Sequence, residues 1–211
     1  QVPALFAATS HDEPVPPLAT RLGRANADRL IDQLQASGMA EDDAEATESW
    51  ALTLLFGNIA TADLGLSADN GVESVLTRAF AAAGKRVGGL ETAHQQLTLF
   101  DDLPASAQDA MLASSLDRTS QSKDTIRATI RAWAAGDVAS ISRMASEDLA
   151  RTPGLAEPLV HARNRRWADQ LAARMARPGT ILVAVGTGHL VGEDSLIALL
   201  QARGLTVQRL A

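Results

Sequence analysis

The chain has 211 residues, of which 46% are hydrophobic and 3% aromatic, and it carries a formal net charge of −6 at pH 7. Its size suits one domain with a real core, and the absence of cysteine excludes disulfides, Cys-ligated zinc, iron–sulfur clusters and a cysteine nucleophile. The negative charge and the lack of a basic patch argue against nucleic acid as a partner, and no apolar run reaches the ~18 residues of a membrane span.

Prolines punctuate the first 17 residues, which are therefore predicted to form an extended lead-in. Within it His11 stands beside Asp12 and Glu13, a combination that could bind a metal or transfer protons. A solvated loop is the favoured interpretation. Residues 18–211 are predicted to form a single domain.

Apolar residues recur with helical spacing over most of that domain. Gly38, Gly84 and Gly136 mark helix ends, and the spacing of Thr92 and Gln95 is that of a capping box at a helix start. Helices are predicted over 18–37, 42–57 with a possible extension to 64, 72–83, 92–100, 104–116, 123–135, 137–150 and 157–176.

Polar residues break the apolar stripe of the last of these helices. Asn164 falls between Val160 and Trp167 on the stripe, and Arg163 lies at its margin. An inward polar pair needs partners, because burying it unpaired costs several kcal/mol. A structural anchor and a role in an active site are both open for this pair.

The stretch after that helix predicts a βαβ unit. Residues 180–185 form an apolar, β-branched run that indicates a strand buried on both faces. A helix opened by Glu193, Asp194 and Ser195 follows, then a second strand over 205–210, so the two strands should be parallel. With a third short strand over 85–90, the sequence predicts a helix-rich α/β fold with a small, mostly parallel sheet.

His189 and Glu91 each follow a predicted strand, where open α/β folds place their ligands. An imidazole and a carboxylate suit a divalent ion and also serve as general acid and base. A dinucleotide site is disfavoured, since Gly186, Gly188 and Gly192 are spaced one residue too widely and no acidic residue ends the next strand. A purely structural role for His189 is the alternative.

At these positions the chain resembles the TraB/GumN (PrgY, TIKI) family, over about residue 18 to the end. The resemblance implies an α/β fold like that of erythromycin-esterase-like and ChaN-like proteins, with two G-x-x-H motifs and a central glutamate. The first of those motifs is absent from the sequence, so the N-terminal half-site is expected to be missing. The residues that carry the resemblance are VGTGHLVG at 185–192, RGLTV at 203–207, GLET at 89–92, QL at 96–97, FDDLP at 100–104, GVE at 71–73, and RN and WA at 163–164 and 167–168.

Since animal TIKI members are described as metal-dependent proteases, the resemblance implies a metal-dependent hydrolase, in the first instance a peptidase. It implies a divalent ion (Mn, Co or Zn) held by His189 and Glu91, and catalytic roles for Glu91, His189 and Arg163. Substrate binding is expected at Asn164, Gly186, Gly188 and Gln96. The substrate would be a peptide or another small molecule, and many relatives carry export signals, which favours the bacterial periplasm or envelope over the cytoplasm. The alternative is a non-catalytic binding or regulatory protein on the same scaffold, linked to exopolysaccharide production or to sequestration of a peptide signal.

Overall fold

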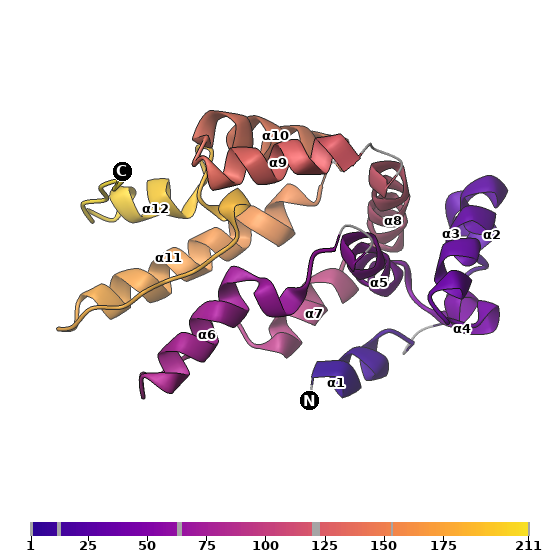
Figure 1. The fold of residues 1–211 in the computed structure, drawn as a ribbon, viewed down its shortest axis with the longest axis horizontal. Coiled ribbons are helices and arrows are strands. Elements are labelled where there is room, and N and C mark those ends of the chain that lie inside the picture. Colours follow the sequence, from indigo (N-terminus) through magenta and orange to yellow (C-terminus); the bar gives the residue numbers. More distant parts are fainter. Residues whose placement is uncertain (1, 12–13, 63–64, 120–122, 153, 211) are drawn as a thin grey trace. The chain divides into compact units, whose positions relative to one another are not determined.

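The computed structural model describes residues 2–11, 14–62, 65–119, 123–152 and 154–210. Within these ranges every regular element is helical (Figure 1). The chain divides into two compact units, Gln1–Gly71 with Glu91–Lys123, and Val72–Leu90 with Asp124–Ala211. The single domain predicted over 18–211 stays a prediction.

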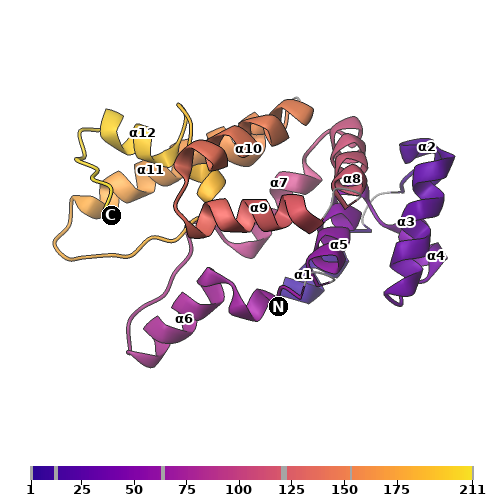
Figure 2. The same cartoon turned by 45° about the horizontal axis from the view of Figure 1, so that its top comes forward.

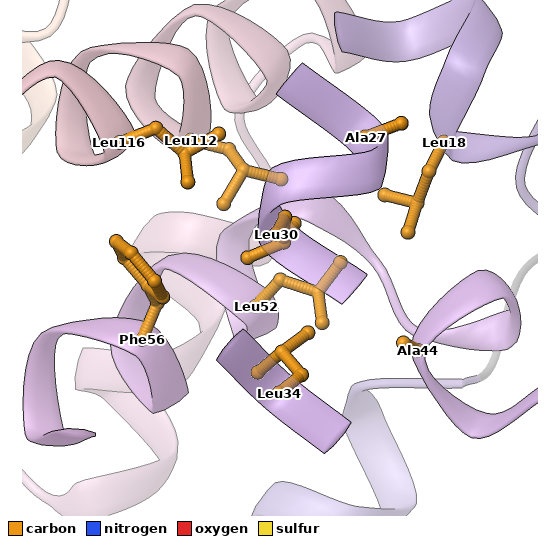
Figure 3. Packing of buried hydrophobic residues seen from close by; sticks show 9 residues of the cluster. All are labelled: Leu18, Ala27, Leu30, Leu34, Ala44, Leu52, Phe56, Leu112 and Leu116. Carbon is orange, nitrogen blue, oxygen red and sulfur yellow. The ribbon is translucent and has the colours of Figure 1, made fainter. Parts of the chain in front are cut away.

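The first unit is a helical assembly around one apolar core. Helices α5 and α8 lie side by side in both views (Figures 1 and 2), and α3 packs against α8. Figure 3 shows the leucines of these helices turned toward one another, with Phe56 at the side of the group. The unit contains α1 (Val2–Thr9), α2 (Leu18–Leu22), α3 (Arg24–Ala36), α4 (Glu41–Ala46), α5 (Ser49–Ala62), the 3₁₀ turn Ala68–Asn70, α7 (Ala93–Asp101) and α8 (Ala105–Thr119).

Three local predictions differ in this unit. Residues 2–9, expected to be extended, form α1. The helix predicted over 18–37 is divided at Gly23, whose φ of +76° is a left-handed conformation that glycine adopts without strain. The helix predicted from residue 42 is divided at Thr47, which is extended and hydrogen-bonds through Oγ1 to the Asp43 carbonyl at 2.6 Å.

The second unit carries the C-terminal helices. Helix α12 packs on α11, and the buried side chains of Trp167, Ala168, Leu171 and Leu196 form the centre of their contact. The predicted helices over 72–83, 123–135, 137–150 and 157–176 are confirmed to within two residues at most ends. The unit contains α6 (Val72–Ala82), α9 (Lys123–Ala134), α10 (Val138–Arg151), the π-helical turn Glu157–His161, α11 (Ala162–Met175), the 3₁₀ turn Thr187–His189 and α12 (Leu196–Ala202).

The predicted α/β fold with a parallel sheet is wrong for the described residues, which contain no strand. Residues 180–186 run as a non-helical trace beside α11 (Figure 1). Only Ile181 and Val185 pack on the core of this unit, while Leu182 and Val183 are 57% and 37% exposed, so the run is not buried on both faces.

Backbone pairing explains the difference. A strand exists only where its N–H and C=O groups pair with another extended segment, and no described residue forms a backbone hydrogen bond with residues 180–185. The other two predicted strands, over 85–90 and 205–210, likewise lack a ladder partner among the described residues. Apolar, β-branched composition favours extended backbone but cannot supply the second strand.

No helix in the described ranges is both long enough and apolar enough to cross a membrane.

Candidate functional site around His189

His189 ends a tight 3₁₀ turn that follows the apolar run. The turn is closed by hydrogen bonds from the His189 amide to the Gly186 carbonyl at 3.0 Å and from the Leu190 amide to the Thr187 carbonyl, also at 3.0 Å. A Cβ atom built on Gly186 would lie 3.9 Å from His189 Cδ2, which is ordinary contact. The turn leaves the imidazole half-buried against α11.

Asn164 on α11 holds the imidazole. Its side chain is 1% exposed, and its Oδ1 lies 2.7 Å from His189 Nδ1. The amide nitrogen of the same side chain donates to the Asp194 carbonyl at 2.9 Å and reaches the His189 carbonyl at 3.5 Å. Because the amide nitrogen faces carbonyl oxygens, Oδ1 must be the atom that faces the ring, and it can only accept.

This arrangement assigns the tautomer of neutral His189. The Nδ1 atom carries the proton and donates it to Asn164, so the lone pair of the neutral ring is on Nε2. A second residue that fixes ring orientation and tautomer in this way is typical of histidines that bind a metal or accept a proton. The contacts of Asn164 position His189, and its predicted contact with substrate stays a prediction.

An aromatic ring and a guanidinium complete the surroundings of the imidazole. The ring centroids of Trp167 and His189 are 4.5 Å apart, and Arg163 Cζ lies 4.7 Å from the Trp167 centroid, where a cation is attracted by the ring face. Arg163 also donates to the Leu159 carbonyl at 3.0 Å. The structure therefore brings together three predicted site residues, His189, Asn164 and Arg163, within the second unit.

A pocket of about 220 Å³ opens next to this cluster. Predicted residue Gly188 lines it together with Asn164, and His161 contributes an imidazole whose Nδ1 lies 3.8 Å from Asp194 Oδ2 and 3.9 Å from Glu157 Oε2. The walls come from α10, the start of α11 and the loop after His189. The lining residues are Ser142, Ala145, Ser146, Leu149, Val160, His161, Asn164, Gly188, Val191, Gly192, Glu193 and Asp194.

Glu91 and Gln96 belong to the first unit. Glu91 is half-buried and directly precedes Thr92, whose side chain and Gln95 form the predicted capping box of α7. Gln96 is exposed on that helix. The pairing of Glu91 with His189 and the substrate contact of Gln96 stay predictions.

Leu90, the residue before Glu91, belongs to the second unit. It packs on the apolar cluster of that unit, and its carbonyl accepts a hydrogen bond from Gln170 Nε2 at 3.2 Å.

The donor types of His189 and Glu91 suit a divalent ion, since an imidazole and a carboxylate are common ligands. The described residues contain no group of three or more His, Cys, Asp or Glu that could hold such an ion. A catalytic zinc-type site uses about three protein ligands, so His189 and Glu91 would be too few to hold such an ion on their own.

His11, the histidine near the N-terminus, has contacts that are typical of a structural residue. It hydrogen-bonds through Nδ1 to Ser10 Oγ at 2.8 Å and through Nε2 to Thr47 Oγ1 at 2.9 Å. These contacts tie the end of α1 to the junction between α4 and α5. Asp12 and Glu13 beside it lie outside the described residues.

Sequence reasoning missed the pocket residues contributed by α10 and by the loop after His189. Glu193 and Asp194 were interpreted only as the start of a helix. The glycines around His189 could have indicated these loop residues. A glycine-rich turn exposes backbone carbonyls, and an inward Asn can bind them.

Comparisons with known proteins agree with the motifs. A model of the TraB/PrgY/gumN family matches residues 4–209. The uncharacterized protein YbaP of Escherichia coli (strain K12) is 25% identical over 184 residues, 87% of this chain and 68% of YbaP, and YbaP of Shigella flexneri gives the same figures. A metalloprotease TIKI homolog of Amphimedon queenslandica is 33% identical over 79 residues, 36% of this chain and 14% of that protein. No solved structure matches the chain.

Proposed function

Because the chain belongs to the TraB/PrgY/gumN family, we propose that it is a hydrolase that cleaves peptide bonds with the help of a divalent metal ion. The family relative named as a metalloprotease motivates the choice of reaction. The match to that relative covers 36% of this chain, so the proposal depends chiefly on the chemistry of the His189 cluster.

The observation that carries the proposal is the hydrogen bond between Asn164 and His189. The buried Asn164 carbonyl oxygen accepts from Nδ1–H, which leaves the lone pair of the ring on Nε2. A histidine held in one tautomer loses little entropy when Nε2 takes up a ligand or a proton.

The chain's own residues have distinct parts in this proposal. His189 would provide its Nε2 atom as a ligand, and Glu91 would act either as a second ligand or as the base that takes a proton from the attacking water. Arg163, held over the Trp167 ring, stabilises negative charge that develops on the substrate oxygen. A bound Mn, Co or Zn ion would supply a water of lowered pKa and polarise the scissile carbonyl.

The test combines metal analysis with peptide cleavage, using the full-length protein. We expect bound Mn, Co or Zn in the purified protein, its loss in His189→Ala, and loss of at least about 100-fold in peptide cleavage in Glu91→Gln. His94→Ala is the matched control, because His94 is exposed on α7, three residues after Glu91. It should keep both metal and activity.

A contrary result has a clear form. If His189→Ala folds, binds its ligand as the unmodified protein does, and neither protein contains metal, the scaffold serves as a binding or regulatory protein. Equal losses in His94→Ala and His189→Ala would also contradict the assignment of the site.

A further inference from the structure

A pocket adjoins the surroundings of His189, although His189 itself does not line it. Gly188 and Asn164 belong both to the pocket lining and to the immediate surroundings of His189. At about 220 Å³ the pocket has room for one amino-acid side chain. Its lining residues on α10 and in the loop after His189 all belong to the second unit.

Four of the side chains that line the pocket are aliphatic. Ala145 and Leu149 come from α10, Val160 from the π-helical turn, and Val191 from the loop after His189. Such walls suit the methylene groups of a long side chain. The hydroxyl groups of two further lining residues, Ser142 and Ser146, add hydrogen-bonding capacity without charge.

The ionised groups of the pocket are acidic. Glu193 and Asp194 are both exposed to solvent, and among the described lining residues none is lysine or arginine. A side-chain hydrogen bond to Glu157 raises the pKa of Arg165, and the charge of Asp194 raises it to a smaller degree. Arg165 does not line the pocket; within the described lining the group close to Asp194 is the His161 imidazole, whose Nδ1 lies 3.8 Å from Asp194 Oδ2.

We propose that this pocket selects a lysine or arginine side chain of the peptide, with Leu149 and Val191 around the methylene stem and Asp194 and Glu193 at the cationic head. This inference deepens the proposed function, on which it rests, by naming the substrate class. A side chain with an apolar stem and a cationic end matches a lining that contains both aliphatic side chains and carboxylates. An aliphatic or acidic side chain matches that lining less well.

Binding tests the inference without any cleavage. The probes are Nα-acetyl-lysine amide and Nα-acetyl-norleucine amide, which share a methylene stem and differ in charge, titrated into the full-length protein with the imidazole signals of its four histidines observed by NMR. We expect the lysine probe to shift the His161 and His189 signals, and to bind at least about threefold more tightly than the norleucine probe.

Charge-neutral variants locate the effect. In Glu193→Gln/Asp194→Asn, binding of the lysine probe should weaken about three- to tenfold while binding of the norleucine probe is unchanged. The matched control is Glu147→Gln, since Glu147 is an exposed acid on α10 that pairs with Arg143 at 3.6 Å and does not line the pocket. It should leave both probes unaffected.

Three results would overturn the inference: equal affinity for the two probes, no shift of His161 from either probe, or unchanged lysine binding in the double variant. Cleavage separates this from the proposed function. If paired peptides with lysine and norleucine are both left intact while the lysine probe still binds through Asp194, the hydrolase proposal fails and the pocket assignment stands. If both are cleaved equally, the hydrolase proposal stands and the pocket assignment fails.

Discussion

Asn164 is the residue on which the His189 site depends. It is a buried amide on a helix whose other inward side chains, Trp167, Ala168 and Leu171, are mainly apolar. Each of its polar side-chain atoms has a partner, either the His189 ring or a carbonyl of the loop that follows. A single side chain thereby joins α11 to the loop that carries the imidazole and forms one side of the pocket.

Asn164→Ala should reduce the free energy of unfolding by about 1–3 kcal/mol, because it leaves the Asp194 carbonyl and the His189 ring without their partner. Urea unfolding at pH 7 measures this loss. Nitrogen-15 NMR of His189 should show the Nδ1–H tautomer in the unmodified protein and a mixture of tautomers in the variant.

Gln170→Ala is the control for this substitution. Gln170 is also an amide on α11, but it is exposed and bonds only to the Leu90 carbonyl in the described residues, so its loss should cost less than about 0.5 kcal/mol. Equal destabilisation by the two variants would contradict the special role of Asn164.

The pairing of Glu157 with Arg165 should make the stability of the protein depend on pH in the acidic range. A side-chain hydrogen bond from Arg165 lowers the pKa of Glu157 below its ordinary value of 4.5. The pKa of Glu157 is lower in the folded state than in the unfolded state. Its contribution to the free energy of unfolding is therefore complete above about pH 4.5 and disappears as the pH falls through the folded-state pKa. Glu157→Gln should therefore flatten the pH dependence of the unfolding midpoint below about pH 5.

Asp137 is the internal control for that experiment. Hydrogen bonds from Ser140 lower its pKa as well, so Asp137 makes stability depend on pH with the same sign from a different helix. Glu157→Gln should leave the pH dependence due to Asp137 unchanged. A midpoint whose pH dependence is unchanged in Glu157→Gln would show that the Arg165 pair adds nothing in solution.

At the scale of single elements, caps decide where the short helices begin. At the start of α7 the Thr92 side chain accepts a hydrogen bond from the Gln95 amide, and the Gln95 side chain accepts one from the Thr92 amide, as their spacing predicts. Ser195 caps α12, where its side chain accepts from the Ala198 amide at 3.2 Å. Helix α12 has seven residues, too few to be stable without its cap and its contact with α11.

Ser195→Ala should destabilise the second unit by about 0.5–2 kcal/mol, the usual value of an N-cap. Thermal unfolding followed by circular dichroism measures it. Ser195→Thr keeps the cap and should lose less than half as much. If Thr and Ala cost the same, then the tight packing around Ser195, and not its hydrogen bond, is what matters.

At the scale of the whole molecule, the exposed apolar run over 180–185 is the least expected feature. Its backbone groups have no backbone partner within the described residues, while the helices α5 and α8 of the first unit enclose an apolar core. Amides without a hydrogen-bonded partner exchange with solvent quickly. Ile181 and Val185 pack through their side chains only.

Hydrogen exchange by mass spectrometry should therefore show fast exchange over 181–185 and slow exchange in α5, α8 and α11. Peptides from 96–101 on α7 serve as an internal helical reference. Protection of 181–185 equal to that of α11 would show that this run pairs as a strand in solution, contrary to the structure.

The sequence by itself determined the helices and the chemistry of the site residues. Periodicity and caps located α6, α7, α9, α10 and α12 because both depend on residues within one or two turns of each other. The motifs around His189 and Glu91 indicated the family, which the match over residues 4–209 confirms. Arg163 and Asn164 were identified as an inward polar pair from spacing alone.

Only the tertiary structure decided which groups meet. Extended segments pair, and the Asn164 amide meets His189, only where residues far apart in the chain come together. The same holds for the pocket, where Glu193 and Asp194 join lining residues from α10. Local composition cannot express such contacts: the run over 180–185 has the side chains of a strand, and the absence of a partner for its backbone in the described residues left it without a sheet.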